Sequence, residues 1–347
     1  MWNPDAYLEN LYGSVSPKYH FKAQSKAEWQ LWQNGLRQEL VARLGGFPEV
    51  PAALNPAILE ETECEGYIRQ RVAFTTYAGL IMPAYVLIPE ERAVKQGKEE
   101  KQAKLPAVVA CHGHGYGSRE IVGLEQDGSV QKGDPGYQKN FAVELVKRGF
   151  LVIAPELLGF GDRRMQAEFE TNAHSCHTLS TYLLQMGQTM AGHRVYETIR
   201  ALDYLQQRED VDPRRIGCMG ISGGGLVASF VAAIDDRVSA AVVSGYVSTF
   251  KESILSIHHC VDNYVPGLNL QAEMPDIVSL IAPRALLIEA GTKDPIFPVT
   301  SAIAAADQIA ETYRLLGAEE KVDRDIFEGD HEISGAKAYD LLVRWLA

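Results

Sequence analysis

Cysteine is scarce in this chain, and its cysteines form no familiar pattern. The sequence of 347 residues contains five of them, widely spaced and without a CxxC pair: Cys64, Cys111, Cys176, Cys218 and Cys260. An odd number at such spacings indicates neither a disulfide framework nor a zinc knuckle. We therefore expect reduced thiols, as in an intracellular protein.

The chain also lacks a long apolar run and an excess of basic residues. Residues 1–5 show neither the basic start nor the apolar stretch of an export signal, and no later run has the length of a membrane span. There are 33 basic and 45 acidic residues, which gives a formal net charge of −12. Because binding to nucleic-acid phosphates depends on basic side chains, nucleic acid is a poor partner. We expect a cytoplasmic protein that binds neither membranes nor nucleic acid.

What the chain does contain is the composition of a globular protein and an alternation of strand and helix patterns. Hydrophobic residues make up 46% and charged residues 22%, which are ordinary values for a globular chain. Eight stretches have the character of strands, at residues 67–77, 80–88, 105–111, 150–154, 216–221, 238–247, 285–290 and 322–327. Helical periodicity between the later stretches implies right-handed crossovers. We predict an α/β fold with a mostly parallel, eight-stranded sheet and helices on both faces.

The segments outside this alternation are assigned by composition and length. Residues 1–60 show a mostly helical pattern that ends at a Gly-Gly pair, and we interpret them as a helical N-terminal extension. Residues 90–104 are dense in charge without apolar periodicity and are predicted to form a solvated loop. The connections at 161–192 and 250–281 are longer than the architecture needs, so we expect them to wall a pocket.

The most informative motif is Gly-Ile-Ser-Gly-Gly-Gly at residues 220–225, between a strand pattern and a small, apolar helix pattern. A serine hydroxyl is a poor nucleophile, so it must stand at a sharp bend where a histidine can take its proton. Glycines two residues to either side permit that bend. GxSxG alone also occurs in ordinary turns, but the flanking strand and helix favour Ser222 as a nucleophile.

Two partners follow in the required order. Asp294 comes after the strand at 285–290, and His331 comes after the strand at 322–327. Ser, Asp, His is the chain order of α/β-hydrolases, and parallel strands end at one edge of a sheet. We expect Ser222 to attack an acyl carbonyl, His331 to accept and return the proton, and Asp294 to hold the imidazole tautomer.

Simpler interpretations of these residues stay open at this point. Asp294 precedes a proline and could be a turn-forming residue, and His331 could be an ordinary loop histidine. Glu289 and Asp330 are weaker rivals for the acid. Glu289 would lie inside its strand, whereas Asp330 adjoins the histidine and points poorly for pairing.

An oxyanion that develops on the substrate also needs fixed donors. The residue after the nucleophile supplies one backbone amide, that of Gly223. The second is expected from the loop after the strand at 105–111, where the sequence reads His-Gly-His-Gly. We assign it to the backbone amide of His114.

Histidines in this loop and elsewhere invite a metal interpretation. His112 and His114 are separated by one residue, and His258 and His259 are adjacent. A zinc site needs three or four converging ligands, and the sequence assembles no such set. We therefore predict no metal and no cofactor, and expect the imidazole of His112 to brace its loop by hydrogen bonds.

Three strings give the chain a family resemblance. They are VACHGHG at 109–115, DPRRIG at 212–217 leading into GISGG at 220–224, and PRALLI at 283–288 with Asp294 beyond it. The chain resembles the acetyl xylan esterase-like branch of the α/β-hydrolase superfamily, which is related to the dienelactone hydrolases. The similarity covers roughly residues 60–347, so 61–347 would be the α/β-hydrolase catalytic domain.

The resemblance implies a carboxylic ester hydrolase that works through a Ser-His-Asp triad without a cofactor. Expected substrates are acetyl or other short-acyl esters of sugars or other small alcohols. It also implies a homo-oligomer, for whose contact apolar residues near the N-terminus are candidates: Trp2, Tyr7, Leu8 and Leu11. From the polar, aromatic loop after 250 and the strand before it, Tyr246 and His258 are candidates for lining the substrate pocket.

Two other functions compete with the esterase. An oligopeptidase of the related family shares the GxSxGG motif, but such enzymes generally carry a large N-terminal propeller that the short helical preface cannot supply. A non-catalytic scaffold that only binds a ligand is the other alternative. Every triad position is filled, which favours an enzyme.

Overall fold

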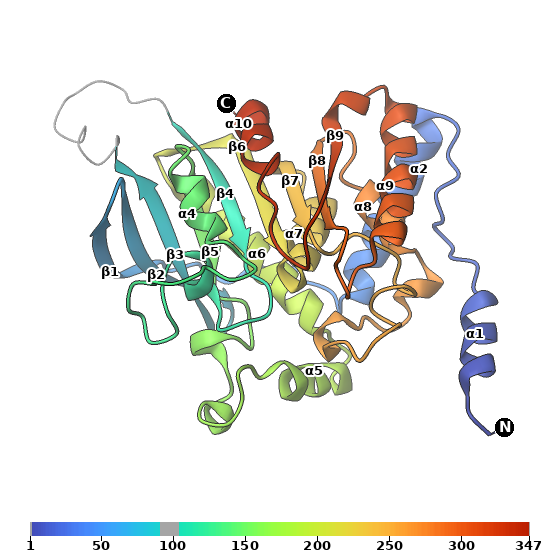
Figure 1. The fold of residues 1–347 in the computed structure, drawn as a ribbon, viewed down its shortest axis with the longest axis horizontal. Helices are drawn as coiled ribbons and strands as arrows, with labels where there is room; N and C mark the ends of the chain where they lie inside the picture. Colours follow the sequence, from blue (N-terminus) through green and yellow to red (C-terminus); the bar gives the residue numbers. More distant parts are fainter. Residues whose placement is uncertain (1, 91–103, 347) are drawn as a thin grey trace.

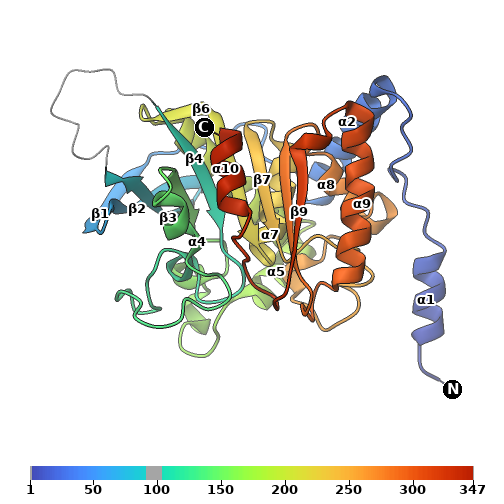
Figure 2. The same cartoon turned by 45° about the horizontal axis from the view of Figure 1, so that its top comes forward.

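The computed structural model describes residues 2–90 and 104–346. The predicted loop at 90–104 therefore lies almost entirely outside the described residues. Within them the chain builds one large sheet with helices on both faces, as Figures 1 and 2 show. Its strands are β1 (Ala57–Cys64), β2 (Tyr67–Tyr77), β3 (Leu80–Pro89), β4 (Leu105–Cys111), β5 (Leu151–Pro155), β6 (Val211–Ile221), β7 (Val238–Ser244), β8 (Ala285–Gly291) and β9 (Val322–Phe327).

The order across the sheet is β1-β2-β3-β5-β4-β6-β7-β8-β9. The first three strands are antiparallel, and β3 also pairs antiparallel with β5. From β5 to β9 every pairing is parallel. The α/β fold with a mostly parallel sheet is thus confirmed. The predicted count of eight strands is wrong, because β1 adds a ninth strand at the edge, starting inside the segment predicted as helical.

Alternation along the strands decides which side chains face which helices. In β4, Ala107, Val109 and Cys111 belong to one core cluster, while Val108 and Ala110 belong to the other. The first cluster packs under α2 (Lys26–Arg43), α6 (Met190–Gln207), α7 (Gly223–Ile234), α8 (Met274–Ser279) and α9 (Val299–Leu316). The second packs under α4 (Phe141–Val146) and α10 (Ala338–Leu346). Strands that are apolar on both faces therefore form the central layer.

The N-terminal region contains two helices with different roles. α2 is capped by the Ser25 hydroxyl, which accepts the amide hydrogen of Glu28, and it buries Leu36 and Leu40 against the core. α1 (Asp5–Gly13) buries none of its residues and lies at the periphery in Figure 1. Two contacts join it to the body: the Tyr12 hydroxyl donates to Glu273 at 2.9 Å, and Glu9 pairs with Lys251 at 2.8 Å. Trp2, Tyr7, Leu8 and Leu11 are all exposed. Their packing on a second copy stays a prediction.

The two long connections are locally structured rather than open loops. Residues 161–192 contain α5 (Cys176–Gln185), and residues 250–281 contain α8. Short 3-10 turns complete the chain: η1 (Ser118–Ile121), η2 (Gly161–Arg163), η3 (Gln166–Glu168), η4 (Val261–Asn263), η5 (Leu268–Leu270) and η6 (Glu319–Lys321). Among the described residues, no helix combines the length and the apolar character that crossing a membrane requires.

Candidate active site

Ser222 stands at the turn between β6 and α7, the strand–turn–helix unit that the sequence predicts. Its backbone has φ 57° and ψ −123°, a conformation that a residue with a side chain rarely adopts. Two glycines make the turn possible. A Cβ on Gly220 would lie 2.1 Å from the carbonyl oxygen of Gly224, and a Cβ on Gly224 would lie 2.0 Å from that of Cys111. The serine is thus held in a strained bend by close backbone packing.

Asp294 and His331 meet at the same edge of the sheet, after β8 and β9. Nδ1 of His331 lies 2.7 Å from Oδ2 of Asp294, a hydrogen bond between two largely buried groups. The other carboxylate oxygen accepts the amide hydrogens of Ile296 and Phe297 at 2.8 and 3.0 Å. Asp294 therefore does form a turn, and the same turn aims its free oxygen at the histidine.

Three neighbours restrict the imidazole of His331. Its ring stacks with those of Tyr137 and Phe297, at centroid distances of 5.8 and 5.7 Å. A Cβ on Gly245, at the end of β7, would lie 3.0 Å from its Cε1. The remaining nitrogen, Nε2, is buried and has no hydrogen-bond partner among the described residues. No hydrogen bond joins this nitrogen to Ser222 among the described residues, so their contact stays a prediction.

Glu289, a rival for the acid, is engaged elsewhere. Its carboxyl oxygens accept the Ser244 hydroxyl at 2.5 Å and the Gly335 amide hydrogen at 3.0 Å. Burial inside β8 raises the pKa of Glu289 from 4.5 to about 7. The only acid that the structure hydrogen-bonds to His331, among the described residues, is Asp294.

The loop after β4 brings His114 next to the turn that holds Ser222. A Cβ on Gly223 would lie 3.1 Å from Nδ1 of His114. The amide of Gly113 donates to Oε1 of Gln138 at 2.7 Å, and the His114 carbonyl accepts the Tyr137 hydroxyl at 2.5 Å. The Gly113 amide before His114 and the His114 carbonyl after it are therefore both hydrogen-bonded, and these bonds hold the loop in place.

His112 braces this loop, as predicted. The Leu157 amide donates to Nε2 of His112 at 3.1 Å, so the proton of the neutral ring is on Nδ1, 2.8 Å from the Gly113 carbonyl oxygen. Burial lowers the pKa of His112, which keeps the ring neutral.

With this geometry in view, comparisons with known proteins assign the family. The family model described as "Abhydrolase family" matches residues 6–323. The chain belongs to this family. A Bacillus subtilis (strain 168) protein named as a hydrolase, YtaP, is 30% identical over 292 residues, which cover 81% of this chain and 88% of that protein.

Solved structures agree on the fold of this Abhydrolase member. A protein from Bacteroides fragilis, described as an acetyl xylan esterase, superposes with a TM-score of 0.78 at 18% identity, over 94% of this chain and 83% of that chain. A glucuronoyl esterase from Solibacter usitatus gives a TM-score of 0.64 at 15% identity, over 95% and 98%. The α/β-hydrolase fold inferred from the sequence is confirmed.

The two predicted pocket residues of this Abhydrolase protein lie in different environments. Tyr246 is 1% exposed, and its ring contacts those of Phe230 and Phe297. His258 is exposed. Its neighbour His259 is the one whose ring meets Phe297, at a centroid distance of 6.1 Å. Pocket lining by Tyr246 and His258 stays a prediction.

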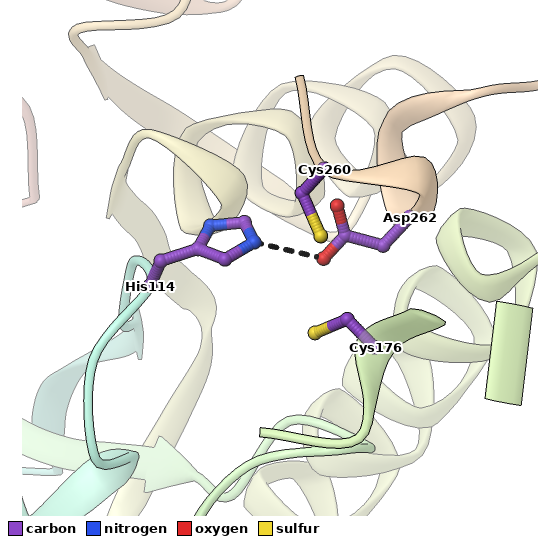
Figure 3. Close-up of side chains that lie close together, drawn as sticks. All are labelled: His114, Cys176, Cys260 and Asp262. Atoms are coloured by element: carbon purple, nitrogen blue, oxygen red, sulfur yellow. Dashed lines mark ion pairs between the residues drawn. The ribbon is translucent and has the colours of Figure 1, made fainter. Parts of the chain in front are cut away.

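A second cluster beside the site was missed by the sequence analysis. His114, Cys176, Cys260 and Asp262 bring their polar atoms within 4.8 Å of one another (Figure 3). Burial opposes a charge on His114, but attraction to the Asp262 carboxylate raises the pKa of this histidine to about 9. Arg194 contacts both Asp262 and Cys176. Only Cys260 and Asp262 are near in sequence, so no local spacing signals this set.

Proposed function

We propose that this Abhydrolase protein is a serine carboxylic ester hydrolase that acts on acetyl or other short-acyl esters of sugars or other small alcohols. The observation that carries the proposal is the pairing of His331 with Asp294, which leaves Nε2 of the histidine buried and without a partner in the described part of the chain. Ser222 is presented by its strained turn at the same edge of the sheet. These are the parts that acyl transfer needs.

In the proposed reaction, Ser222 Oγ attacks the ester carbonyl while its proton passes to Nε2 of His331. The imidazolium is stabilised by Asp294 and then returns the proton to the leaving alcohol oxygen, which gives an acyl-enzyme. A water molecule repeats the sequence on the acyl-enzyme and releases the carboxylic acid. The chemistry requires no cofactor.

The negative charge that forms on the carbonyl oxygen needs donors in place beforehand. Gly223 is the first residue of α7, where the backbone amides are not used by the helix itself. The proposed second donor is the amide of His114, whose loop is held against Gly223 by the contacts of Gly113 and Tyr137. Removing one such donor typically costs 10²–10³ in kcat.

The proposed substrate class is inferred from the names of structural neighbours and not from the shape of a cavity. Structural neighbours carry the names acetyl xylan esterase and glucuronoyl esterase, both of which act on carbohydrate esters by name. A panel of p-nitrophenyl esters of rising acyl length, together with acetylated sugars, tests this part directly. Highest kcat/KM for acetyl esters supports the proposal, whereas a preference for long acyl chains contradicts it.

The serine mechanism is tested with Ser222→Ala and p-nitrophenyl acetate. Loss of the nucleophile is expected to lower kcat by a factor on the order of 10⁵–10⁶. Ser239→Ala is the matched control, because Ser239 lies at the start of β7, away from the strand ends that carry the proposed site. Within the described residues its hydroxyl donates only to the Arg214 carbonyl oxygen. Turnover that survives in Ser222→Ala would rule out the mechanism.

Two further measurements separate the alternatives. A fluorophosphonate probe should label the wild-type chain and not Ser222→Ala, and a chain that resists labelling would be a binding scaffold. Hydrolysis of a peptide amide should be far slower than that of the matching ester. Equal rates would point to a peptidase.

A further inference from the structure

Four side chains from three separate segments point at one another beside the proposed active site. His114 lies in the loop after β4, Cys176 is the first residue of α5, and Cys260 and Asp262 lie at η4. One ligand atom from each residue falls within 4.8 Å of the other three. In Figure 3 the imidazole, the two thiols and the carboxylate surround a common point.

The donor atoms are those that zinc prefers. Tetrahedral Zn²⁺ takes cysteine sulfur at about 2.3 Å and histidine nitrogen or carboxylate oxygen at about 2.0 Å, so its ligands lie roughly 3.3–3.8 Å apart. Nε2 of His114 and Oδ2 of Asp262 are already 3.1 Å apart. The widest separation within the cluster is at most 4.8 Å. Closing the site around an ion therefore requires movements of about 1 Å or less.

The surroundings of the cluster resemble the second layer of a metal site. Nη2 of Arg194 lies 3.2 Å from Cys176 Sγ, and Nη1 lies 2.5 Å from Oδ2 of Asp262. The Asn263 side chain donates to the other oxygen of Asp262 at 2.7 Å. Such contacts orient ligands that would otherwise rotate. Cys176 and Asp262 are themselves buried.

The formal charges also balance around a divalent ion. Two thiolates and a carboxylate carry three negative charges, and Zn²⁺ with the Arg194 guanidinium carries three positive ones. His114 gives up its ring proton when it binds the ion, so a neutral imidazole completes the set. A buried group of like charges would be costly, whereas this one is neutral with the ion in place.

We propose that His114, Cys176, Cys260 and Asp262 bind one zinc ion in a structural site. All four positions are filled by the protein, which is typical of structural rather than catalytic zinc. The ion would tie both long connections, 161–192 and 250–281, to the loop whose His114 amide is the proposed oxyanion donor. It would thus hold these two connections in a fixed position relative to the loop that carries His114.

The first test is metal content. The full-length, tag-free protein, purified in a non-chelating reductant and dialysed against buffer with a trace of zinc, should contain about one zinc per chain by mass spectrometry of its metals. Cys176→Ser and Cys260→Ser should each lower that content to background. Cys64→Ser is the matched control, since Cys64 is a partly buried thiol outside the cluster, and it should retain zinc.

The second test needs no variant to fold. Co²⁺ added to metal-free wild-type protein should produce the near-ultraviolet absorption of sulfur-to-cobalt charge transfer, saturating at one ion per chain. Ser222→Ala should give the same spectrum, so this result is independent of whether the protein is an esterase. Wild-type protein without stoichiometric zinc and without that absorption would overturn the site. The residues would then form a metal-free ion network around Arg194.

Discussion

The hydroxyl of Tyr137 donates a hydrogen bond of 2.5 Å to the main-chain oxygen of His114. The same tyrosine stacks its ring on His331, with a centroid distance of 5.8 Å. One side chain therefore contacts both the proposed general base and the loop proposed to stabilise the oxyanion. Burial raises the pKa of Tyr137, so its hydroxyl remains a donor at any working pH.

Tyr137→Phe keeps the ring on His331 and removes the bond to His114. A typical hydrogen bond contributes about 1 kcal/mol, so we expect kcat to fall roughly fivefold with little change in KM. Steady-state kinetics on p-nitrophenyl acetate measures this split. Tyr339→Phe, which removes a tyrosine hydroxyl in α10, is the matched control. An unchanged kcat in Tyr137→Phe would show that the loop does not need this bond.

Asp294→Asn is expected to abolish most activity while the protein stays folded. The amide oxygen of asparagine can still accept the amide hydrogens of Ile296 and Phe297, which now bind Oδ1. Its NH₂ group would face Nδ1 of His331 and favour the wrong tautomer, at a cost on the order of 10⁴ in kcat. Steady-state kinetics measures the loss of activity, and a thermal melt checks that the variant stays folded. Retention of more than a tenth of the activity would exclude Asp294 as the acid.

Ser222→Gly and Ser222→Ala should both be inactive but should differ in stability. The positive φ of Ser222 costs on the order of 1–3 kcal/mol for any residue with a Cβ. Glycine removes that strain, although it gains flexibility in the unfolded chain. We expect the glycine variant to be more stable than the alanine variant by about 1 kcal/mol in urea denaturation. Equal stabilities would mean that the turn carries no such strain.

Glu289→Gln is expected to change how stability depends on pH. The folded state holds the pKa of Glu289 at about 7 against 4.5, so between these values the folded chain binds more protons than the unfolded one. Stability contributed by this group is therefore intact below pH 4.5 and declines as the pH rises toward 7.

The uncharged variant lacks this decline. Relative to wild type, its free energy of unfolding should improve between pH 4.5 and pH 7.5, by an amount on the order of 3 kcal/mol at about 1.4 kcal/mol for each pKa unit. Urea denaturation at both pH values gives the comparison. A difference that does not vary with pH would show that Glu289 ionises normally in the folded state.

The edge strand β1 shows where local pattern fails. Its first five residues are exposed, and the segment AILEETEC offers no clean alternation of buried and exposed positions. It becomes a strand because β2 supplies its hydrogen bonds, from Ala57 opposite Ala73 to Cys64 opposite Tyr67. A strand that gains little from burial depends on its partner, which no window of sequence contains.

The sequence analysis missed the stacking of His331 and the cluster of His114, Cys176, Cys260 and Asp262 for a related reason. Tyr137 and Phe297 flank the histidine from segments far apart in the chain, and Cys176 lies more than eighty residues before Cys260. The scattered cysteines, interpreted from spacing alone, gave no sign that two of them would lie together. A site of this kind exists only once three loops converge.

The sequence by itself determined the strand–turn–helix around Ser222, the central strands and the placement of Asp294 and His331 after two of them. Those features follow from local patterns and from the rule that parallel strands end at one edge of a sheet. Only the tertiary structure decided that Asp294 rather than Glu289 faces the histidine, that Tyr137 bridges the two halves of the site, and which four side chains gather at Asp262. Side-chain directions across loops depend on packing between distant segments, and local sequence does not encode them.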